Sequence, residues 1–508
     1  MRIKEKFLKI RPVYFFITSG LILSIALNYS TGFGGAKGLD IIFLMLLLTT
    51  LSLFRTTRSA IVIPYLLLMA IYQPVACIYG IPSPSIIAAL MQTNEREATE
   101  FIISLPFISY LYFLLTAFVM IVFIKSSQRI KPEKKHVRIM VSLSALLCFV
   151  LVVTAKLDKV KTVRFFITGY QAIVKYEEQI TILTSHQGVP RWEVDDFKSP
   201  YANIVVIVGE SMRSDYMSMC GYPLPTTPFL DTVAGKFYCH YVSTAPNTFL
   251  SLPRTLSLAS GKNFDLATNV VTLANKAGLD TFWLSNQGML GEFDVPTSKL
   301  AIYSKHSVFL KKGDYGSSNT DDIQLLPEFD KALAAKNDHK MIVLHIMGSH
   351  PDFEARLNGA TPYFHYANKD ISDYLSTYRK TDSFIEAVYQ RLKNSGQSFK
   401  LFYFSDHGLS EKKINDSVYL RHGSDARQNY AIPLVILSSD AAGRTYVNNK
   451  KSAFNFISLF SREVNIQIRS PHLNQWRDDT QEDIRVFNGE TMTEYDKLND
   501  EPAVLLDK

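Results

Sequence analysis

The stretch LFYFSDHGLS, residues 401–410, joins an apolar run to a strongly polar end. Its first four residues are bulky and apolar, which is typical of a strand that is buried on both faces of a sheet. Asp406, His407 and Gly408 follow almost at once. Because open α/β sheets hold ligands at the carboxyl ends of their strands, this stretch predicts a metal-binding pair there. A polar turn that leaves the core is the simpler alternative.

Apolar runs of the same kind recur after residue 200. They cover residues 203–208, 281–285, 341–346, 400–404 and 432–437, and segments of helical period lie between them. This alternation is typical of a mostly parallel sheet covered by helices. We therefore predict an α/β domain over residues 201–470, followed by a polar, peripheral tail over residues 471–508.

Carboxylate and imidazole side chains follow several of these runs. Glu210 comes after the first run, His350 after the third, Asp406 and His407 after the fourth, and His422 lies shortly beyond. Oxygen and nitrogen donors of these kinds are what a zinc-like cation takes. Each position alone has a simpler explanation, because a helix start favours a carboxylate and a single histidine is more often a surface or core residue. Their joint occurrence at strand ends favours a metal site.

Hydroxyl side chains are concentrated in STAPNTFLSLPRTLSLASG, residues 243–261. Metal coordination is one way to turn a hydroxyl into a nucleophile, so this stretch is a candidate source of one. Several of the same hydroxyls would also serve as helix caps. The residues alone leave all seven hydroxyls open.

The first third of the chain has a different composition. Five apolar stretches, residues 13–29, 40–54, 59–80, 101–124 and 139–155, approach the length that crosses a bilayer as a helix. We predict a five-helix transmembrane domain over residues 1–155. Residues 156–200 mix basic and aromatic side chains, which indicates an amphipathic bridging segment on the membrane surface or a linker helix packed on the following domain.

Basic residues gather in the first eleven positions, at residues 55–58 and at residues 125–138. By the positive-inside rule the amino terminus is cytoplasmic, and five crossings place the domain after residue 155 outside. The net charge of +7 then reflects topology, and we expect membrane lipids, not nucleic acid, as partners. In an outside compartment Cys220 and Cys239 could form a disulfide or stay unpaired.

Four ordered motifs carry a family resemblance: VIVGES at residues 206–211, LHIMGSH at 344–350, FSDHGLS at 404–410 and RHG at 421–423. With the five predicted spans, they resemble the phosphoethanolamine transferases of Gram-negative inner membranes. The resemblance implies a multi-pass membrane protein with a periplasmic α/β domain of alkaline-phosphatase and sulfatase fold.

The resemblance also implies roles for individual residues. It implies that Glu210, Asp406 and His407 hold a catalytic Zn²⁺, and that further zinc ions could bind. Thr248 falls in TFLSLP, which matches a family T-x-x-S-x-P pattern, so it is implied as the nucleophile and a fourth metal ligand. The remaining implied positions bind the substrate, its phosphate or a second metal; they are His350, His422, Asn286 and Gln287.

The implied reaction moves phosphoethanolamine from phosphatidylethanolamine to an envelope acceptor through a threonine intermediate. The acceptor would be lipopolysaccharide, at lipid A or a core sugar, or a periplasmic glycan. Leu409 and Ser211 depart from the family pattern, where Glu and Thr are common, and this leaves the acceptor open. Two alternatives remain: a phosphoglycerol transferase of the lipoteichoic acid synthase type, and a non-catalytic envelope scaffold.

Overall fold

The computed structural model describes residues 2–83, 86–87, 90–91, 98–99, 102, 105–185, 188–288, 296–311, 320–414, 417–469 and 476–505. They fall into two compact units, each of which is described by itself. The first comprises residues 1–87 and 102–174, and the second comprises residues 88–101 and 175–508.

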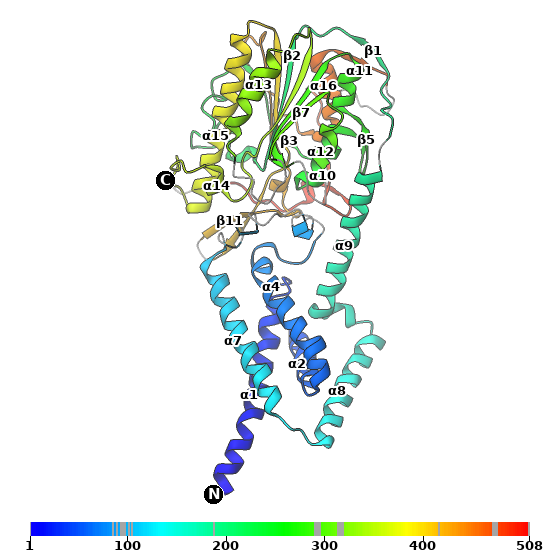
Figure 1. The fold of residues 1–508 in the computed structure, drawn as a ribbon, viewed down its shortest axis with the longest axis vertical. Coiled ribbons are helices and arrows are strands. Elements are labelled where there is room, and N and C mark those ends of the chain that lie inside the picture. Colours follow the sequence, from blue (N-terminus) through cyan, green and yellow to red (C-terminus); the bar gives the residue numbers. More distant parts are fainter. Residues whose placement is uncertain are drawn as a thin grey trace. The chain divides into compact units, whose positions relative to one another are not determined.

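The first unit is helical (Figure 1). Its main helices are α1 (Arg2–Tyr29), α2 (Gly38–Ser52), α4 (Ile63–Tyr79), α7 (Phe107–Arg129) and α8 (Lys134–Val153), and α4 follows the short segments α3 (Arg55–Thr57) and η1 (Arg58–Val62). Among the described residues, four segments are long and apolar enough to cross a membrane: Pro12–Tyr29, Arg55–Tyr79, Phe107–Arg129 and Lys134–Val153. The fifth predicted span, α2, is apolar but shorter.

The predicted fourth span, residues 101–124, contains the start of α7. This helix begins at Phe107, directly after Pro106, whose backbone is not helical. Residues before a proline are biased away from helical angles, which accounts for a boundary at this point. The helix then extends through Lys125 to Arg129.

The bridging stretch is largely one helix, α9 (Lys161–Ser185), preceded by the turn η2 (Leu157–Lys159). Phe166, Ile167, Tyr170 and Ile173 of α9 are exposed. The boundary between the two units falls within this helix, after Val174.

The second unit is built on a sheet of order β13-β3-β12-β9-β2-β8-β6-β7, with β14 paired to β3. The strands are β2 (Asn203–Gly209), β3 (Gly235–Val242), β6 (Asp280–Gly288), β7 (His306–Lys311), β8 (Lys340–His345), β9 (Phe399–Ser405), β12 (Ala431–Ser438), β13 (Arg444–Tyr446) and β14 (Lys451–Ser452). All five predicted strands are confirmed. The sheet is mostly parallel, and only β12 runs antiparallel to its neighbours β3 and β9.

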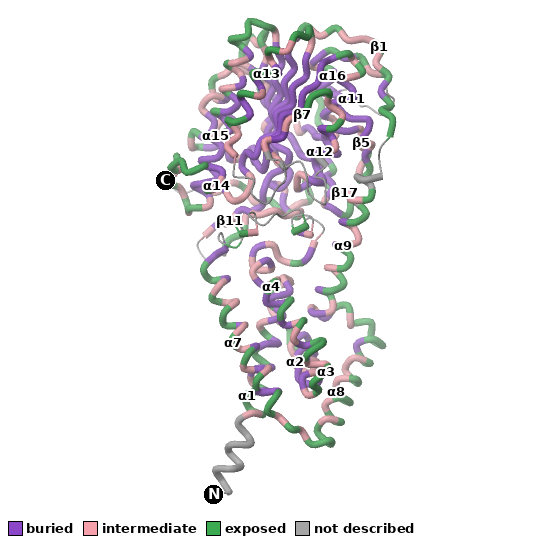
Figure 2. Tube along the Cα trace, in the orientation of Figure 1, coloured by how far each residue is buried: buried purple, intermediate pink, exposed green. Residues whose placement is uncertain are grey.

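Helices cover both faces of this sheet. Figure 1 shows α13 (Leu326–Leu333) and α15 (Lys369–Asn394) on one side, and α11 (Val270–Lys276) and α16 (Phe456–Val464) on the other. The central strands β2, β8 and β9 are buried along their whole length (Figure 2). Such strands bury both faces against helices, which explains their near-continuous apolar sequences.

Smaller elements complete the second unit. The helices are α10 (Thr248–Leu256), α12 (Pro296–Ala301) and α14 (Phe353–Arg356). Four two-stranded ladders pair β1 (Val194–Phe197) with β15 (Ile466–Ile468), β4 (Ser257–Ser260) with β5 (Asn263–Asn269), β10 (Ser410–Ile414) with β11 (Ser417–Arg421), and β16 (Arg485–Phe487) with β17 (Met492–Glu494).

Two further features bear on the site. Cys220 and Cys239 form a disulfide, which decides between the two alternatives that the sequence left open. The sequence predicts a peripheral tail after residue 471, whereas Trp476, Val486 and Phe487 are buried in the second unit. These apolar side chains are scattered among charged ones, so the average composition of the segment conceals them.

Candidate metal centre

Two adjacent parallel strands deliver the candidate ligands to the same end of the sheet. In the register of β2 and β9, Gly209 lies opposite Ser405. Glu210 and Asp406 are therefore the next residues on neighbouring strands, and His407 follows Asp406. Parallel pairing thus brings together side chains that are almost 200 residues apart in the sequence.

The ligand atoms of Glu210, Asp406 and His407 lie within 4.8 Å of one another, and all three residues are buried. Thr248 lies at the same point: its Oγ1 is 2.6 Å from Asp406 Oδ2, 3.0 Å from Glu210 Oε2 and 3.4 Å from His407 Nε2. Thr248 is the first residue of α10, whose amino-terminal cap is the Asn247 side chain. Of the seven hydroxyls that the sequence left open, the structure brings Thr248 to the carboxylates.

The backbone beyond Glu210 is held in an unusual conformation. Ser211 has a φ of 59°, in the left-handed region that costs a non-glycine residue roughly 1 kcal/mol. Its N–H donates to Asp406 Oδ1 at 3.1 Å, and its hydroxyl donates to Glu210 Oε1 at 2.7 Å. The Tyr374 hydroxyl donates to its carbonyl oxygen at 2.7 Å. The first two bonds orient the two carboxylates, and the third holds the Ser211 backbone in place.

The charges of the cluster perturb one another. Burial lowers the pKa of His407, but the Asp406 and Glu210 carboxylates outweigh this and raise it to about 9. Burial raises the pKa of Asp406, and the charge of Glu210 acts in the same direction. Burial alone would raise the pKa of Glu210, but the hydrogen bond between Glu210 and His407 lowers it. Two carboxylates so close together in a buried site would be stabilised by a cation.

The donor set fits a divalent metal. Two carboxylates, one imidazole and one hydroxyl converge, and carboxylate and imidazole donors are common zinc ligands. His407 Nδ1 lies 2.8 Å from the Gly408 carbonyl oxygen, so the Nδ1–H donates there. This leaves Nε2, which faces the carboxylates, as the atom available to a metal.

Known proteins share this architecture. The sulfatase family model matches residues 202–462. The chain is 30% identical over 478 residues to the phosphoethanolamine transferase OpgE of Escherichia coli, covering 90% of this chain and 88% of that protein. The chain belongs to the phosphoethanolamine transferase family. This transferase is also 24% identical over 485 residues to EptC of Escherichia coli, covering 84% of this chain and 82% of that protein.

Solved structures of two relatives confirm the predicted fold of the transferase. The integral membrane protein EptA of Neisseria meningitidis aligns with a TM-score of 0.61 at 17% identity, covering 91% of this chain and 97% of that chain. The periplasmic domain of EptC of Escherichia coli, solved in complex with Zn, aligns with a TM-score of 0.51 at 22% identity. It covers 62% of this chain and 97% of that chain.

Two more predicted residues of the transferase lie beside the cluster. The His422 ring centroid is 5.1 Å from that of His407 and 6.5 Å from that of His350. Burial, with the charges of His407 and His350, lowers the pKa of His422 to about 3. Its buried Nδ1 has no hydrogen-bond partner within the described part of the chain. His422 therefore offers a buried ring nitrogen beside the cluster that could bind a polar ligand, and His350 lies next to it.

Asn286 and Gln287, which the family resemblance implies as substrate-binding residues, both hydrogen-bond within the second unit. Asn286 Nδ2 donates to Asp322 Oδ1 at 2.7 Å, and Gln287 Nε2 donates to the Ile346 carbonyl oxygen at 3.1 Å. Asp322 in turn accepts from the N–H groups of Met347 and Gly348 at 2.8 and 3.0 Å. These side chains thus support the loop after β8.

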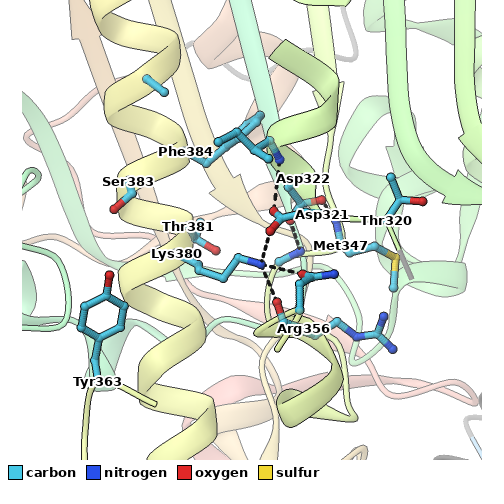
Figure 3. A pocket seen from close by; sticks show the side chains of 14 residues that line it. Thr320, Asp321, Asp322, Met347, Arg356, Tyr363, Lys380, Thr381, Ser383 and Phe384 are labelled. Carbon is cyan, nitrogen blue, oxygen red and sulfur yellow. Dashed lines mark hydrogen bonds and ion pairs between the residues drawn. The ribbon is translucent and has the colours of Figure 1, made fainter. Parts of the chain in front are cut away.

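The loop after β8 also contacts the backbone of the metal-ligand candidate Glu210. The Ser349 N–H donates to the Glu210 carbonyl oxygen at 3.0 Å, and a Cβ added to Gly348 would lie 3.1 Å from the Glu210 backbone. On its other side lies a cavity of about 180 Å³ (Figure 3). There Lys380 Nζ donates to Asp321 Oδ2 at 2.8 Å.

Sequence reasoning missed three residues that hydrogen-bond to the segments around the ligands: Arg213, Asp322 and Tyr374. None belongs to an apolar strand run or a metal-ligand pattern, so no local signal marks them. Leu409, where the family commonly has Glu, is fully buried in the core. It offers no ligand atom to the cluster.

Proposed function

We propose that this transferase moves phosphoethanolamine from phosphatidylethanolamine to an acceptor of the bacterial envelope through a covalent intermediate on Thr248. The observation that carries the proposal is the position of the Thr248 hydroxyl, which meets the Glu210 and Asp406 carboxylates and the His407 imidazole at one buried point. This is the arrangement that an activated hydroxyl nucleophile requires. The zinc complex of the EptC periplasmic domain supports Zn²⁺ as the metal.

Glu210, Asp406, His407 and Thr248 would hold the zinc. When bound, it would lower the pKa of the hydroxyl and neutralise charge on the phosphoryl oxygens. Asp406 Oδ2, 2.6 Å from Thr248 Oγ1, would take the hydroxyl proton. The Thr248 oxygen then forms a bond to phosphorus as the bond to diacylglycerol breaks, and diacylglycerol leaves with a proton.

The second half of the reaction reverses these roles. A hydroxyl or phosphate of the acceptor attacks phosphorus, the bond to Thr248 breaks, and the threonine regains its proton. His422 lies beside His407 and His350 lies beside His422, and both would donate hydrogen bonds to the phosphoryl oxygens. Such donors stabilise the charge that develops in the transition state.

The membrane helices support a location in the bacterial inner membrane. The distribution of Lys and Arg supports a cytoplasmic amino terminus and a periplasmic catalytic unit. A periplasmic site would meet phosphatidylethanolamine at the membrane surface, with lipopolysaccharide or a periplasmic glycan as the acceptor. The relatives OpgE, EptC and EptA are all named phosphoethanolamine transferases, which supports the donor headgroup.

The test uses the purified full chain with zinc and an extract of envelope glycolipid, given either phosphatidylethanolamine or phosphatidylglycerol carrying a labelled headgroup. We expect label on the protein and on envelope glycolipid only with the ethanolamine lipid. Thr248→Ala should abolish both signals. Ser260→Ala, which alters an exposed hydroxyl of the same serine- and threonine-rich stretch, is the matched control and should retain both.

Three outcomes would overturn the proposal. Transfer from phosphatidylglycerol alone would favour the phosphoglycerol transferase alternative. Full transfer by Thr248→Ala would exclude Thr248 as the nucleophile. A wild-type chain that bound zinc but transferred neither headgroup would favour a scaffold.

A further inference from the structure

Arg213 is a fully buried cation that lies three residues after Glu210. Its guanidinium forms two bonds to Asp215, at 2.9 Å from Nε and 2.6 Å from Nη2. Nη1 donates to Glu411 Oε1 at 2.8 Å and to the Leu409 carbonyl oxygen at 3.3 Å. All of its nitrogens therefore have partners, and these partners come from different parts of the chain.

These contacts connect the two segments that carry the metal ligands. Arg213 belongs to the segment that leaves β2 with Glu210, while Leu409 and Glu411 belong to the segment that leaves β9 with Asp406 and His407. The stem of Arg213 also packs closely against this second segment, since a Cβ added to Gly408 would lie 3.0 Å from Arg213 Cγ. One side chain thus sets the spacing between the two ligand segments.

A third segment, residues 501–504, closes the same network. The Glu501 carbonyl oxygen accepts from Arg213 Nη2 at 2.8 Å, and Glu501 Oε2 accepts from the Glu411 N–H at 2.8 Å. The Ala503 N–H donates to Asp215 Oδ2 at 2.9 Å. The segment thus contacts Arg213 and both of its carboxylate partners.

The same segment is held in place by other contacts. The Glu501 N–H donates to Gln428 Oε1 at 2.8 Å, and the Val504 N–H donates to the Tyr216 hydroxyl at 3.0 Å. The Tyr222 hydroxyl donates to the Val504 carbonyl oxygen at 3.0 Å. Residues 501–504 therefore have a defined path across the back of the metal centre.

A buried ion network is a poor source of stability, because desolvation of the charges offsets most of their attraction. Such a network is best attested where it fixes one arrangement against others. Here the arrangement that it fixes is the separation of two ligand segments. Residues behind metal ligands commonly set metal affinity, because they orient the ligands before the metal binds.

We infer that Arg213 and residues 501–504 act together as a clamp that positions Glu210, Asp406 and His407 for the metal. The clamp touches neither substrate nor metal, so its members are positioning residues. The inference rests on the metal site of the proposed function but on no feature of the transferred group. It assigns a role in the metal centre to a segment that the sequence marks only as a polar tail.

The test compares two chains that are shortened only at the carboxyl terminus and are purified with their membrane helices. A stop after Asp500 removes residues 501–508 and so breaks every contact of the clamp segment. A stop after Leu505 removes only residues 506–508 and is the matched control. Zinc affinity by chelator competition and amide hydrogen exchange over residues 406–411 in the metal-free protein are the two readouts.

We expect the stop after Asp500 to weaken zinc binding at least about tenfold and to speed exchange at residues 406–411. The stop after Leu505 should match the wild type in both. Arg213→Lys keeps the charge but loses the fork of donors, so it should also weaken zinc binding. Combined with the stop after Asp500, its effect should be less than additive, because both changes break one network.

Some results would overturn the inference. The inference is wrong if the chain that ends at Asp500 keeps a zinc affinity within twofold of wild type and unchanged hydrogen exchange at residues 406–411. Fully additive effects of the two changes would show that Arg213 and the segment act separately. If the shortened chain does not fold, Glu501→Ala replaces it, and unchanged exchange at the Glu411 N–H would then refute the clamp. If the wild type transferred no headgroup, the proposed function would be wrong, but zinc affinity and hydrogen exchange could still be measured. The two hypotheses can therefore be refuted independently.

Discussion

Replacing Gly408 by alanine tests how tightly the second ligand segment is packed. An added Cβ would lie 2.1 Å from the Gln428 carbonyl oxygen, whereas ordinary Cβ contacts begin at 3.4 Å. Relief of this overlap requires the two backbones to separate by more than an ångström. Backbone atoms cannot rotate away as a side-chain tip can, so the segment that carries His407 must move.

The cost follows from the bonds at this point. The Gly408 N–H donates to the Asn429 carbonyl oxygen at 2.9 Å, and the Gly408 carbonyl accepts from His407 Nδ1. Overpacking of this kind costs about 1–3 kcal/mol of unfolding free energy, and we expect the upper end. Loss of the contacts that orient metal ligands typically costs about 10- to 100-fold in metal affinity, so zinc affinity should fall by that factor.

The assay measures zinc affinity by chelator competition and thermal unfolding of the metal-free full chain in detergent. Gly443→Ala is the control, because a Cβ there meets no atom within 4 Å. We expect the control to match the wild type. Wild-type zinc affinity and stability in Gly408→Ala would refute the close packing of this segment on Gln428, and with it the argument that packing places His407.

Three further predictions concern stability. A chelator should lower the unfolding free energy of the zinc-loaded protein by about 2.7 kcal/mol where free zinc was 100 times its dissociation constant, as calorimetry would show. Burial alone would raise the pKa of Asp478, but hydrogen bonds from Arg462 and Trp476 lower it. The stabilisation that the Asp478 carboxylate gives the folded state is therefore present above about pH 4 and is lost on acidification. Because solvent screens this partly exposed carboxylate, Asp478→Asn should cost about 1 kcal/mol at pH 7, and its difference from wild type should shrink below about pH 4 in urea unfolding. Removal of the Cys220–Cys239 disulfide should cost about 3 kcal/mol in the same assay, since it frees a loop of 19 residues; an unchanged midpoint would contradict this.

The sheet could be predicted from the sequence where its strands are uniformly apolar. β2, β8 and β9 are buried along their whole length, so their sequences are near-continuous apolar runs. β3 escaped prediction because GKFYCHYV mixes polar and apolar residues, as expected of a strand that is not wholly buried. The antiparallel direction of β12 could not be predicted, because a buried run has the same composition in either direction.

The site was predictable only in part. Glu210, Asp406 and His407 follow apolar strands, so the strand-end argument located them. Thr248 has no such signal, because helix caps and nucleophiles draw on the same residue types. Arg213 is harder still: its contact with Glu501 joins positions 288 residues apart, and only the folded chain brings them together.

The two layers of the metal centre have complementary charges, and this decides which substitution at Arg213 is informative. The inner layer contributes the carboxylates of Glu210 and Asp406, which a divalent cation would balance. Behind it, Arg213 balances Asp215 and Glu411. A neutral replacement would leave two more uncompensated carboxylates near the first pair and would alter the field at the metal as well as the spacing of its ligands. Lysine keeps the charge and removes only the fork of donors, so a loss of zinc affinity in Arg213→Lys reports positioning and not electrostatics.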